Sequence, residues 1–132
     1  MDFQPAYQSM ALLHSVKLYD APAIEKAKKI ISKNLIDHWP LPILAAMVGI
    51  NESKLKIGFK ELYKTTPYQF LITLRLEKAK SLLETTHDSI QEIAQKVGFD
   101  NYRGLNRAFK RAYSIMPTEY RSKLEICYSY TE

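Results

Sequence analysis

The chain has 132 residues, of which 46% are apolar and 25% are charged, and its formal net charge is +5. That length suits one domain or two very small ones sharing a core, and the composition is ordinary for a globular protein. A basic protein of this size favours polyanionic partners, with nucleic acid ahead of a membrane surface.

The sequence carries no signal for export or for a membrane. The single cysteine, Cys127, cannot form an internal disulfide, which favours a reducing compartment. The N-terminal run MDFQPAYQSM has no basic stretch followed by an apolar core, and no window approaches 18 continuous apolar residues. We therefore expect a cytoplasmic protein without a membrane partner.

Apolar residues recur at helical spacing from residue 21 onward, and no alternating β-branched run predicts a strand. The segment WPLP at 39–42 ends the first helix, because proline disfavours the helical conformation of the residue before it. A short helix over 43–48 then ends at Gly49, a glycine suited to the left-handed position after a helix. The first helix, 21–35, has a stripe of Ile24, Ala27, Ile31 and Leu35.

Capping residues mark the helices that follow. Asn51 is placed to cap a helix that ends near residue 65, and Thr66-Pro67 opens a long helix. Ser89 and Glu92 form a capping box for a helix that ends at Gly98. A basic helix follows, and Met116-Pro117 starts a last short helix through Arg121. The long helix has a stripe of Ile72, Leu76, Ala79 and Leu83.

An internal repeat organises these helices. Residues 44–49 align with 93–98 at an offset of 49, and residues 55–70 align with 105–120 at an offset of 50. Each copy is a short helix, a glycine turn and a second helix, which is the helix-turn-helix pattern. The aligned pairs include Leu44 with Ile93, Val48 with Val97, Gly49 with Gly98, Leu55 with Leu105, Phe59 with Phe109, Tyr63 with Tyr113 and Pro67 with Pro117.

The second helix of each copy has an apolar side and a polar side. Helical spacing turns Leu55, Gly58, Phe59 and Leu62 inward in the first copy, and Leu105, Ala108, Phe109 and Ala112 in the second. Arginine can bind a guanine edge through two hydrogen bonds, asparagine an adenine edge in the same way, and lysine a phosphate. The polar sides therefore predict contacts with the major groove of DNA; they are Ser53, Lys56, Ile57 and Lys60, and Arg103, Asn106, Arg107 and Lys110.

These motifs resemble the C-terminal DNA-binding domain of AraC/XylS-type transcription regulators. The resemblance covers residues 23–122 and is most specific in RLEKAKSLL, in SIQEIAQKVGF and in Leu-x-x-x-Phe-Lys followed by Met-Pro-x-x-Tyr-Arg. Within the family, VGINESKLKIGFKELYKTT is most similar to regulators of siderophore uptake.

The resemblance implies an all-α fold of about seven helices, forming two helix-turn-helix subdomains joined by a linker helix. The subdomains would span residues 23–66 and 86–122, with the linker helix at 67–85. Residues 1–22 are interpreted as a connector to a domain missing from this chain, which favours a fragment of a longer regulator over a stand-alone member. Residues 123–132 would form a C-terminal tail.

The resemblance also implies sequence-specific binding of double-stranded promoter DNA for regulation of transcription, with two recognition helices in successive major grooves. We expect a monomeric DNA-binding domain, RNA polymerase as a further partner and no cofactor, while dimerisation of the intact regulator stays open. The base-contacting positions of the family correspond here to Ser53, Lys56 and Ile57 in the first copy, and to Tyr102, Arg103, Asn106 and Arg107 in the second.

Two residues depart from the family pattern and leave alternatives open. Ile57 stands where a polar or basic residue is common, so the first copy contacts either thymine methyl groups or little at all. Gly104 stands where a bulky residue is usual, and a glycine inside a helix costs about 1 kcal/mol relative to alanine. It either permits close approach to the DNA backbone or marks a weaker second helix.

The sequence also bears on two classes of function other than DNA binding. A helical module that docks an acidic partner, such as an RNA polymerase subunit, would use the same charge but gives no reason for the repeat. The sequence predicts no enzyme, since it has no glycine-rich phosphate loop, nucleophile motif or paired carboxylates. His14, His38 and His87 lack the spacing of metal ligands, so we expect no metal site.

Overall fold

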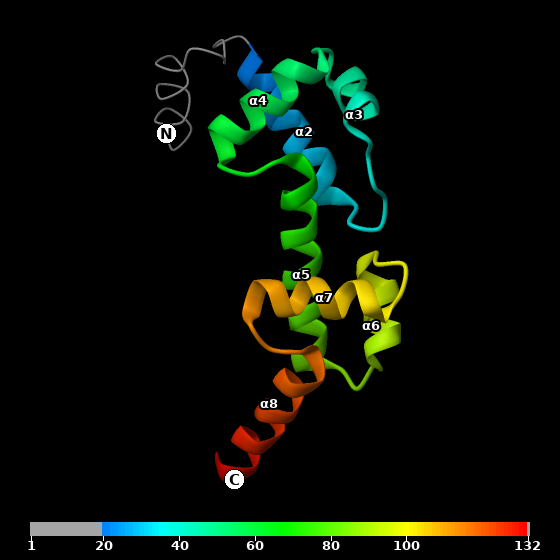
Figure 1. Ribbon diagram of the computed structural model, residues 1–132, viewed down its shortest axis with the longest axis vertical. Coiled ribbons are helices and arrows are strands. Elements are labelled where there is room, and N and C mark those ends of the chain that lie inside the picture. Colours follow the sequence, from blue (N-terminus) through cyan, green and yellow to red (C-terminus); the bar gives the residue numbers. More distant parts are fainter. Residues whose placement is uncertain (1–19, 132) are drawn as a thin grey trace. The chain divides into compact units, whose positions relative to one another are not determined.

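The computed structural model describes residues 20–131, and its regular elements in that range are seven α-helices without a strand (Figure 1). The predicted all-α class is confirmed. None of these helices is both long and apolar enough to cross a bilayer. Residues 1–19, most of the expected connector, lie outside the described range. The helices are α2 (Ala21–Lys33), α3 (Leu41–Val48), α4 (Glu52–Tyr63), α5 (Pro67–Thr85), α6 (Ile90–Val97), α7 (Tyr102–Tyr113) and α8 (Pro117–Thr131).

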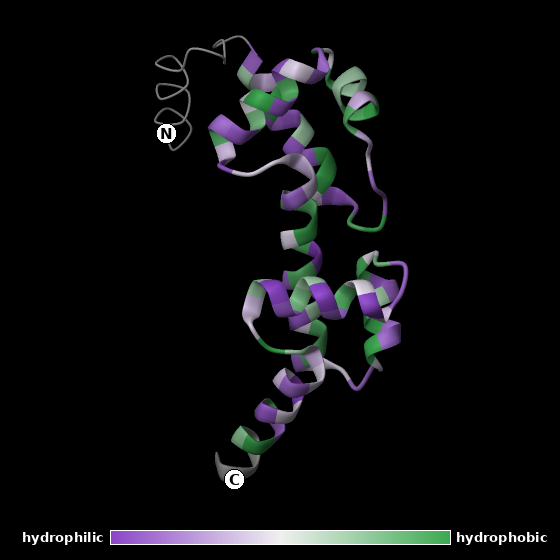
Figure 2. Cartoon of the chain, viewed as in Figure 1, coloured by the Kyte–Doolittle hydropathy of each residue, from purple (hydrophilic) through white to green (hydrophobic). Residues whose placement is uncertain are grey.

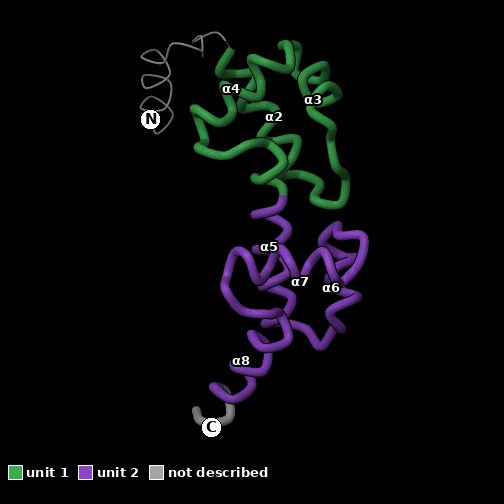
Figure 3. Tube along the Cα trace, in the orientation of Figure 1, with its two compact units in different colours: residues 1–71 green, residues 72–132 purple. Residues whose placement is uncertain are grey.

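The chain forms two compact units that divide inside α5, between Leu71 and Ile72 (Figure 3). In unit 1, helices α2, α3 and α4 pack on one another, and the first residues of α5 close the unit. In unit 2, α6 packs on α7 and α7 on α8. Each unit therefore holds one of the two helix pairs, while the subdomain boundaries given above stay predictions.

Side-chain caps open the helices at the predicted residues. The Asn51 Oδ1 accepts a hydrogen bond from the Lys54 N–H at 2.8 Å and opens α4. At the start of α5, the Thr66 Oγ1 accepts from the backbone N–H three residues further on, at 3.1 Å. Ser89 and Glu92 form the predicted capping box of α6, with reciprocal hydrogen bonds of 3.0 and 2.9 Å. These caps satisfy backbone N–H groups that lack a partner within the helix.

Glycines end the first helix of each pair. Gly49 has a φ of 79° and Gly98 a φ of 107°, in the left-handed region where a side chain would be strained. Their N–H groups donate to the Ala45 and Ala94 carbonyls at 2.9 and 3.1 Å. Both glycines therefore act as the predicted helix terminators.

A buried phenylalanine holds α4, the second helix of the pair in unit 1, in place. Phe59 is 0% exposed, as is Leu55 one turn earlier. The Phe59 ring meets Tyr63 edge-to-face at a centroid distance of 4.9 Å and lies 5.9 Å from Phe70 at the start of α5. Edge-to-face ring pairs add to the free energy gained by burying their apolar surface.

Unit 2 repeats this arrangement. Phe109 and Leu105 are 0% exposed, and Phe109 lies 4.7 Å from the Tyr113 ring and 5.9 Å from the Tyr120 ring. Burial, and to a lesser extent the charge of Glu77, raises the pKa of the Tyr113 hydroxyl. The aligned aromatic residues of the two sequence copies therefore have the same packing role.

The repeat also includes the helix that precedes each pair, which the sequence analysis missed. The Lys28 ammonium of α2 lies 4.4 Å from the Tyr63 ring centroid, and the Lys80 ammonium of α5 lies 5.0 Å from that of Tyr113. Each unit is thus three packed helices followed by a fourth segment, the first residues of α5 in unit 1 and α8 in unit 2. The matching buried residues, at an offset of 52, are Ile24, Ala27 and Ile31 in α2, and Leu76, Ala79 and Leu83 in α5.

Some details differ from prediction. Helix α2 ends at Lys33 rather than at residue 35. Ala112 is exposed rather than turned inward, although it lies on the apolar side of α7, because it is in the last turn of a helix that ends at Tyr113. Helix α8 continues past Arg121 to Thr131, so most of the expected tail is helical. No proline or glycine interrupts residues 118–131, and nothing therefore ends the helix earlier.

We expect Phe109→Ala to lower the free energy of unfolding by about 3–5 kcal/mol, because it leaves a cavity in a core without solvent access. Urea denaturation followed by circular dichroism measures this loss. Tyr102→Ala is the matched control, since Tyr102 is 44% exposed and should cost far less. Equal losses for the two variants would contradict the assigned role of Phe109.

Candidate nucleic-acid interface

Helix α7 turns a cationic side to solvent. The Asn101 Oδ1 caps it by accepting from the Arg103 and Gly104 N–H groups at 2.9 and 3.2 Å. With Leu105 and Phe109 facing the core, hydrophilic and hydrophobic residues alternate along the helix (Figure 2). The exposed residues include four predicted contact positions: Tyr102, Arg103, Arg107 and Lys110.

Asn106, the fifth predicted position of this helix, is only half-exposed. Its Oδ1 is enclosed and has no hydrogen-bond partner among the described residues. An adenine edge needs both the amide oxygen and the amide nitrogen. In this rotamer Asn106 can offer DNA at most one of them, so the expected two-bond contact with adenine requires the side chain to rotate.

Helix α4 has the same design with different residues on its outer side. Leu55, Gly58 and Phe59 are buried. Lys54, on the first turn, lies 4.0 Å from the Asp20 carboxylate, which is itself buried, so this lysine is directed toward α2 rather than outward. All four predicted contact residues of this helix are exposed: Ser53, Lys56, Ile57 and Lys60.

The two outer sides differ in charge. Helix α7 contains four basic residues and no acidic residue; they are Arg103, Arg107, Lys110 and Arg111. Helix α4 contains acidic residues, Glu52 and Glu61, beside its lysines. Phosphate neutralisation by lysine and arginine dominates the affinity of proteins for nucleic acid. Electrostatics alone therefore favours α7 as the stronger contributor to binding.

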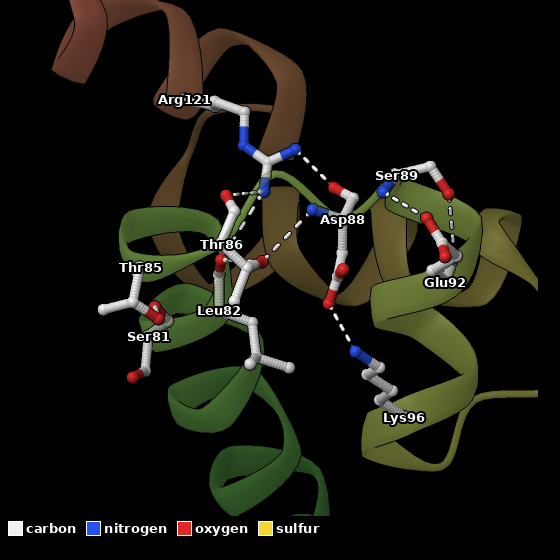
Figure 4. Close-up of polar contacts among 9 residues, drawn as sticks. All are labelled: Ser81, Leu82, Thr85, Thr86, Asp88, Ser89, Glu92, Lys96 and Arg121. Atoms are coloured by element: carbon white, nitrogen blue, oxygen red, sulfur yellow. Dashed lines mark hydrogen bonds and ion pairs between the residues drawn. The ribbon is translucent and has the colours of Figure 1, made fainter.

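Arg121 fixes the turn that leads from α5 into the second helix pair. Its guanidinium donates to the backbone carbonyls of Thr86 and Asp88 at 3.1 and 2.5 Å (Figure 4). It also donates to the Leu83 carbonyl at 3.3 Å. The Leu83 carbonyl belongs to the last turn of α5, where carbonyls lack a partner within the helix, and Thr86 and Asp88 belong to the turn that follows. In the sequence, Arg121 stands out only as part of a family motif and as the expected end of the last helix, and a lone arginine after Pro-x-x-Tyr gives no local signal of this role. Tyr120 beside it donates a hydrogen bond to Glu84.

The same turn is tied to α6 by an ion pair. The Lys96 ammonium lies 2.6 Å from the Asp88 carboxylate. The hydrogen bond from Lys96 holds the pKa of Asp88 below its ordinary value, and the same bond raises the pKa of Lys96. Together with Arg121 and the capping box, this pair sets where α6 begins, and through the Gly98 turn it positions α7.

Comparison with known proteins agrees with this geometry. Residues 44–123 match the family described as a helix-turn-helix domain. The transcriptional regulator MtrA of Neisseria gonorrhoeae is 33% identical over 87 residues, covering 66% of this chain and 29% of MtrA.

Solved structures are similar as well. The C-terminal domain of AraT, a response regulator from Geobacillus stearothermophilus, is 29% identical with a TM-score of 0.73, covering 77% of this chain and 85% of that one. The DNA-binding domain of AdpA, solved in complex with a target DNA, is 28% identical with a TM-score of 0.71, covering 76% and 91%.

The fold and its two exposed polar helix sides define a helix-turn-helix DNA-binding protein. The chain belongs to the AraC/XylS family of transcription regulators, as an AraC-type DNA-binding domain. This family consists of DNA-binding regulators rather than enzymes as a class. The chain spans 29%, 45% and 26% of the length of three curated relatives that it matches. Its similarity to siderophore-uptake regulators stays a prediction.

We expect Gly104→Ala to raise the free energy of unfolding by about 0.5–1 kcal/mol, because alanine is the better helix former. A Cβ at this position would lie 3.5 Å from the Phe99 ring, an ordinary contact. Thermal and urea denaturation measure the change. Gly49→Ala is the contrasting variant and should destabilise, since its φ is 79°. A loss of stability in Gly104→Ala would contradict this reading of the helix.

The affinity of Gly104→Ala for DNA then decides between the two roles left open for this glycine. Unchanged affinity would mean that Gly104 only weakens the helix. Weaker binding by a more stable protein would mean that DNA approaches the backbone at this position.

The Asp88–Lys96 pair predicts a specific response to pH. The Asp88 carboxyl should titrate below its ordinary pKa of 3.8 in the folded protein. Because the folded pKa is the lower one, the stabilisation is present above the unfolded pKa and is lost as pH falls through the folded value. Carbon-detected NMR of the carboxyl group follows the titration. Lys96→Met should raise the Asp88 midpoint, whereas Lys78→Met should not; an unchanged midpoint in Lys96→Met would disprove the assignment.

Proposed function

We propose that this chain binds a specific site on duplex DNA by placing α4 and α7 in two successive major grooves, and so serves the regulation of transcription. The observation that carries this proposal is the repeat, in which each unit buries one side of a second helix and exposes a polar side. Successive major grooves on one face of B-DNA lie about 34 Å apart, and one chain with two recognition helices can occupy both without dimerising.

Each exposed side chain is assigned a role from its chemistry. Arg103 and Arg107 suit guanine edges, and Lys110 suits a phosphate. Tyr102, at the start of α7, can donate from its hydroxyl to a phosphate, and Asn106 contributes a single hydrogen bond unless it rotates. In the first unit Lys60 takes the phosphate role of Lys110, while Ser53 and Lys56 are directed at base edges or the backbone.

The setting in the cell is inferred from the family. We infer that the intact regulator acts in the cytoplasm, contacts RNA polymerase at the promoter and carries additional domains that determine whether it dimerises. DNA binding is favoured over docking of an acidic protein as the main role of the polar sides, because docking does not explain why the helix pair is repeated. The two roles are compatible, since a bound regulator can also contact polymerase.

Selection of binding sites from a randomised duplex pool at ~150 mM salt tests the proposal, because non-specific phosphate binding is already weak there. Enrichment of two half-sites about one helical turn apart would support two recognition helices. A single half-site would mean that one helix alone recognises bases. Weak, salt-sensitive binding without enrichment would favour the protein-docking module.

Arg107→Ala should weaken binding to the selected site by about 1–3 kcal/mol and relax base preference at one position, because it removes a base contact. Lys60→Ala should weaken binding to all sequences alike and lower the salt-dependence slope by about one, because it removes a phosphate contact. Fluorescence anisotropy with specific and random duplexes over a salt series measures both. Identical behaviour of the two variants would refute this division of roles.

A further inference from the structure

The outer side of α4 carries an isoleucine where a base contact is expected. Ile57 is 44% exposed, whereas Leu55 and Phe59 on either side of it in sequence are 0% exposed. Helical geometry therefore places Ile57 on the side opposite the core. It has no core-packing role that would explain an apolar residue there.

The repeat gives Ile57 a counterpart. At the offset of 50 that relates the two second helices, Ile57 corresponds to Arg107 of α7. Both residues are exposed, and both helices are held by the same buried Leu and Phe pair. If α7 presents Arg107 to a base edge, α4 presents Ile57 to the same place in its own groove.

The surroundings of Ile57 point to DNA as its partner. Ser53 lies one turn before it, Lys56 beside it and Lys60 one turn after it, and all three are exposed. Single exposed apolar residues are common on protein surfaces and need no explanation by themselves. This one, however, lies among a hydroxyl and two ammonium groups that can contact bases and hold the flanking phosphates.

Only one base offers an apolar group in the major groove. Isoleucine has no donor or acceptor, so it cannot recognise guanine, adenine or cytosine through their hydrogen-bonding groups. Thymine presents its C5-methyl group there, and contact with it removes apolar surface from water on both molecules. An exposed isoleucine in the major groove would therefore favour thymine over the other three bases.

We propose that Ile57 recognises a thymine through its C5-methyl group in the half-site bound by α4. This inference rests on the proposed function, and it makes the two halves of the DNA site chemically different. Helix α4 recognises a methyl group in its half-site, whereas α7 recognises the hydrogen-bonding edge of a base in the other.

Replacing thymidine by deoxyuridine tests the contact, because uracil pairs like thymine but lacks the methyl group. The selected site is synthesised with deoxyuridine at one position at a time, and affinity is measured by anisotropy at ~150 mM salt. The half-site whose base preference relaxes in Arg107→Ala is assigned to α7, and the other half-site to α4.

At one position of the α4 half-site, deoxyuridine should weaken binding of the wild-type protein about fourfold, the factor that corresponds to roughly 0.8 kcal/mol for one buried methyl group. Ile57→Ala should bind the thymidine and deoxyuridine duplexes equally. Arg107→Ala is the control, and it should bind more weakly but keep the fourfold ratio. Thermal melting should give all three proteins similar midpoints, because both substituted residues are exposed.

The possible failures are distinct. A specific site whose α4 half shows no sensitivity to deoxyuridine, or keeps that sensitivity in Ile57→Ala, overturns the role of Ile57 and leaves the proposed function standing. Selection that yields no site at all overturns both.

Discussion

The fold depends on a repeated contact, in which a phenylalanine of the second helix enters a core made by the helices before and after it. Phe59 and Phe109 have no solvent exposure, and each packs on a tyrosine of its own helix and on an aromatic residue of the next. This contact fixes the rotation of the second helix of each pair about its axis. That rotation decides which side chains face outward, so one packing event sets both the core residue and the residues proposed to contact DNA.

Much of this could be predicted from the sequence because it is local. Helical spacing, a glycine after each first helix and caps such as Asn51 and Ser89 act within a few residues, and the structure contains all of them. The exposed positions of α4 followed from the same periodicity. The proposed contacts with DNA follow from the resemblance and the chemistry of those residues, and they remain predictions.

The features that could not be predicted depend on contacts between residues distant in sequence, or on a small rotation of a side chain at the margin of a helix face. The match of α2 with α5 was missed because its offset is 52 rather than 49 or 50, the connection after α2 being longer. Arg121 binds carbonyls more than 30 residues away, which no local pattern encodes. Asn106 lies at the margin of the apolar side of α7, where a modest rotation decides whether its amide faces the core or the solvent.

The two units also show where duplication preserves residues and where it permits change. The buried positions keep their type, as in Leu55 and Leu105 or Ala27 and Ala79, because a core of fixed volume tolerates little substitution. The outer positions proposed to contact bases differ, with Ser53 against Arg103 and Ile57 against Arg107, whereas Lys60 and Lys110 are the same. If both helices recognise bases as proposed, helices that differ in this way impose no two-fold symmetry on the DNA site, whereas a homodimer requires half-sites related by symmetry. The proposed site would then have a direction along the DNA, and that direction would orient the bound chain on a promoter.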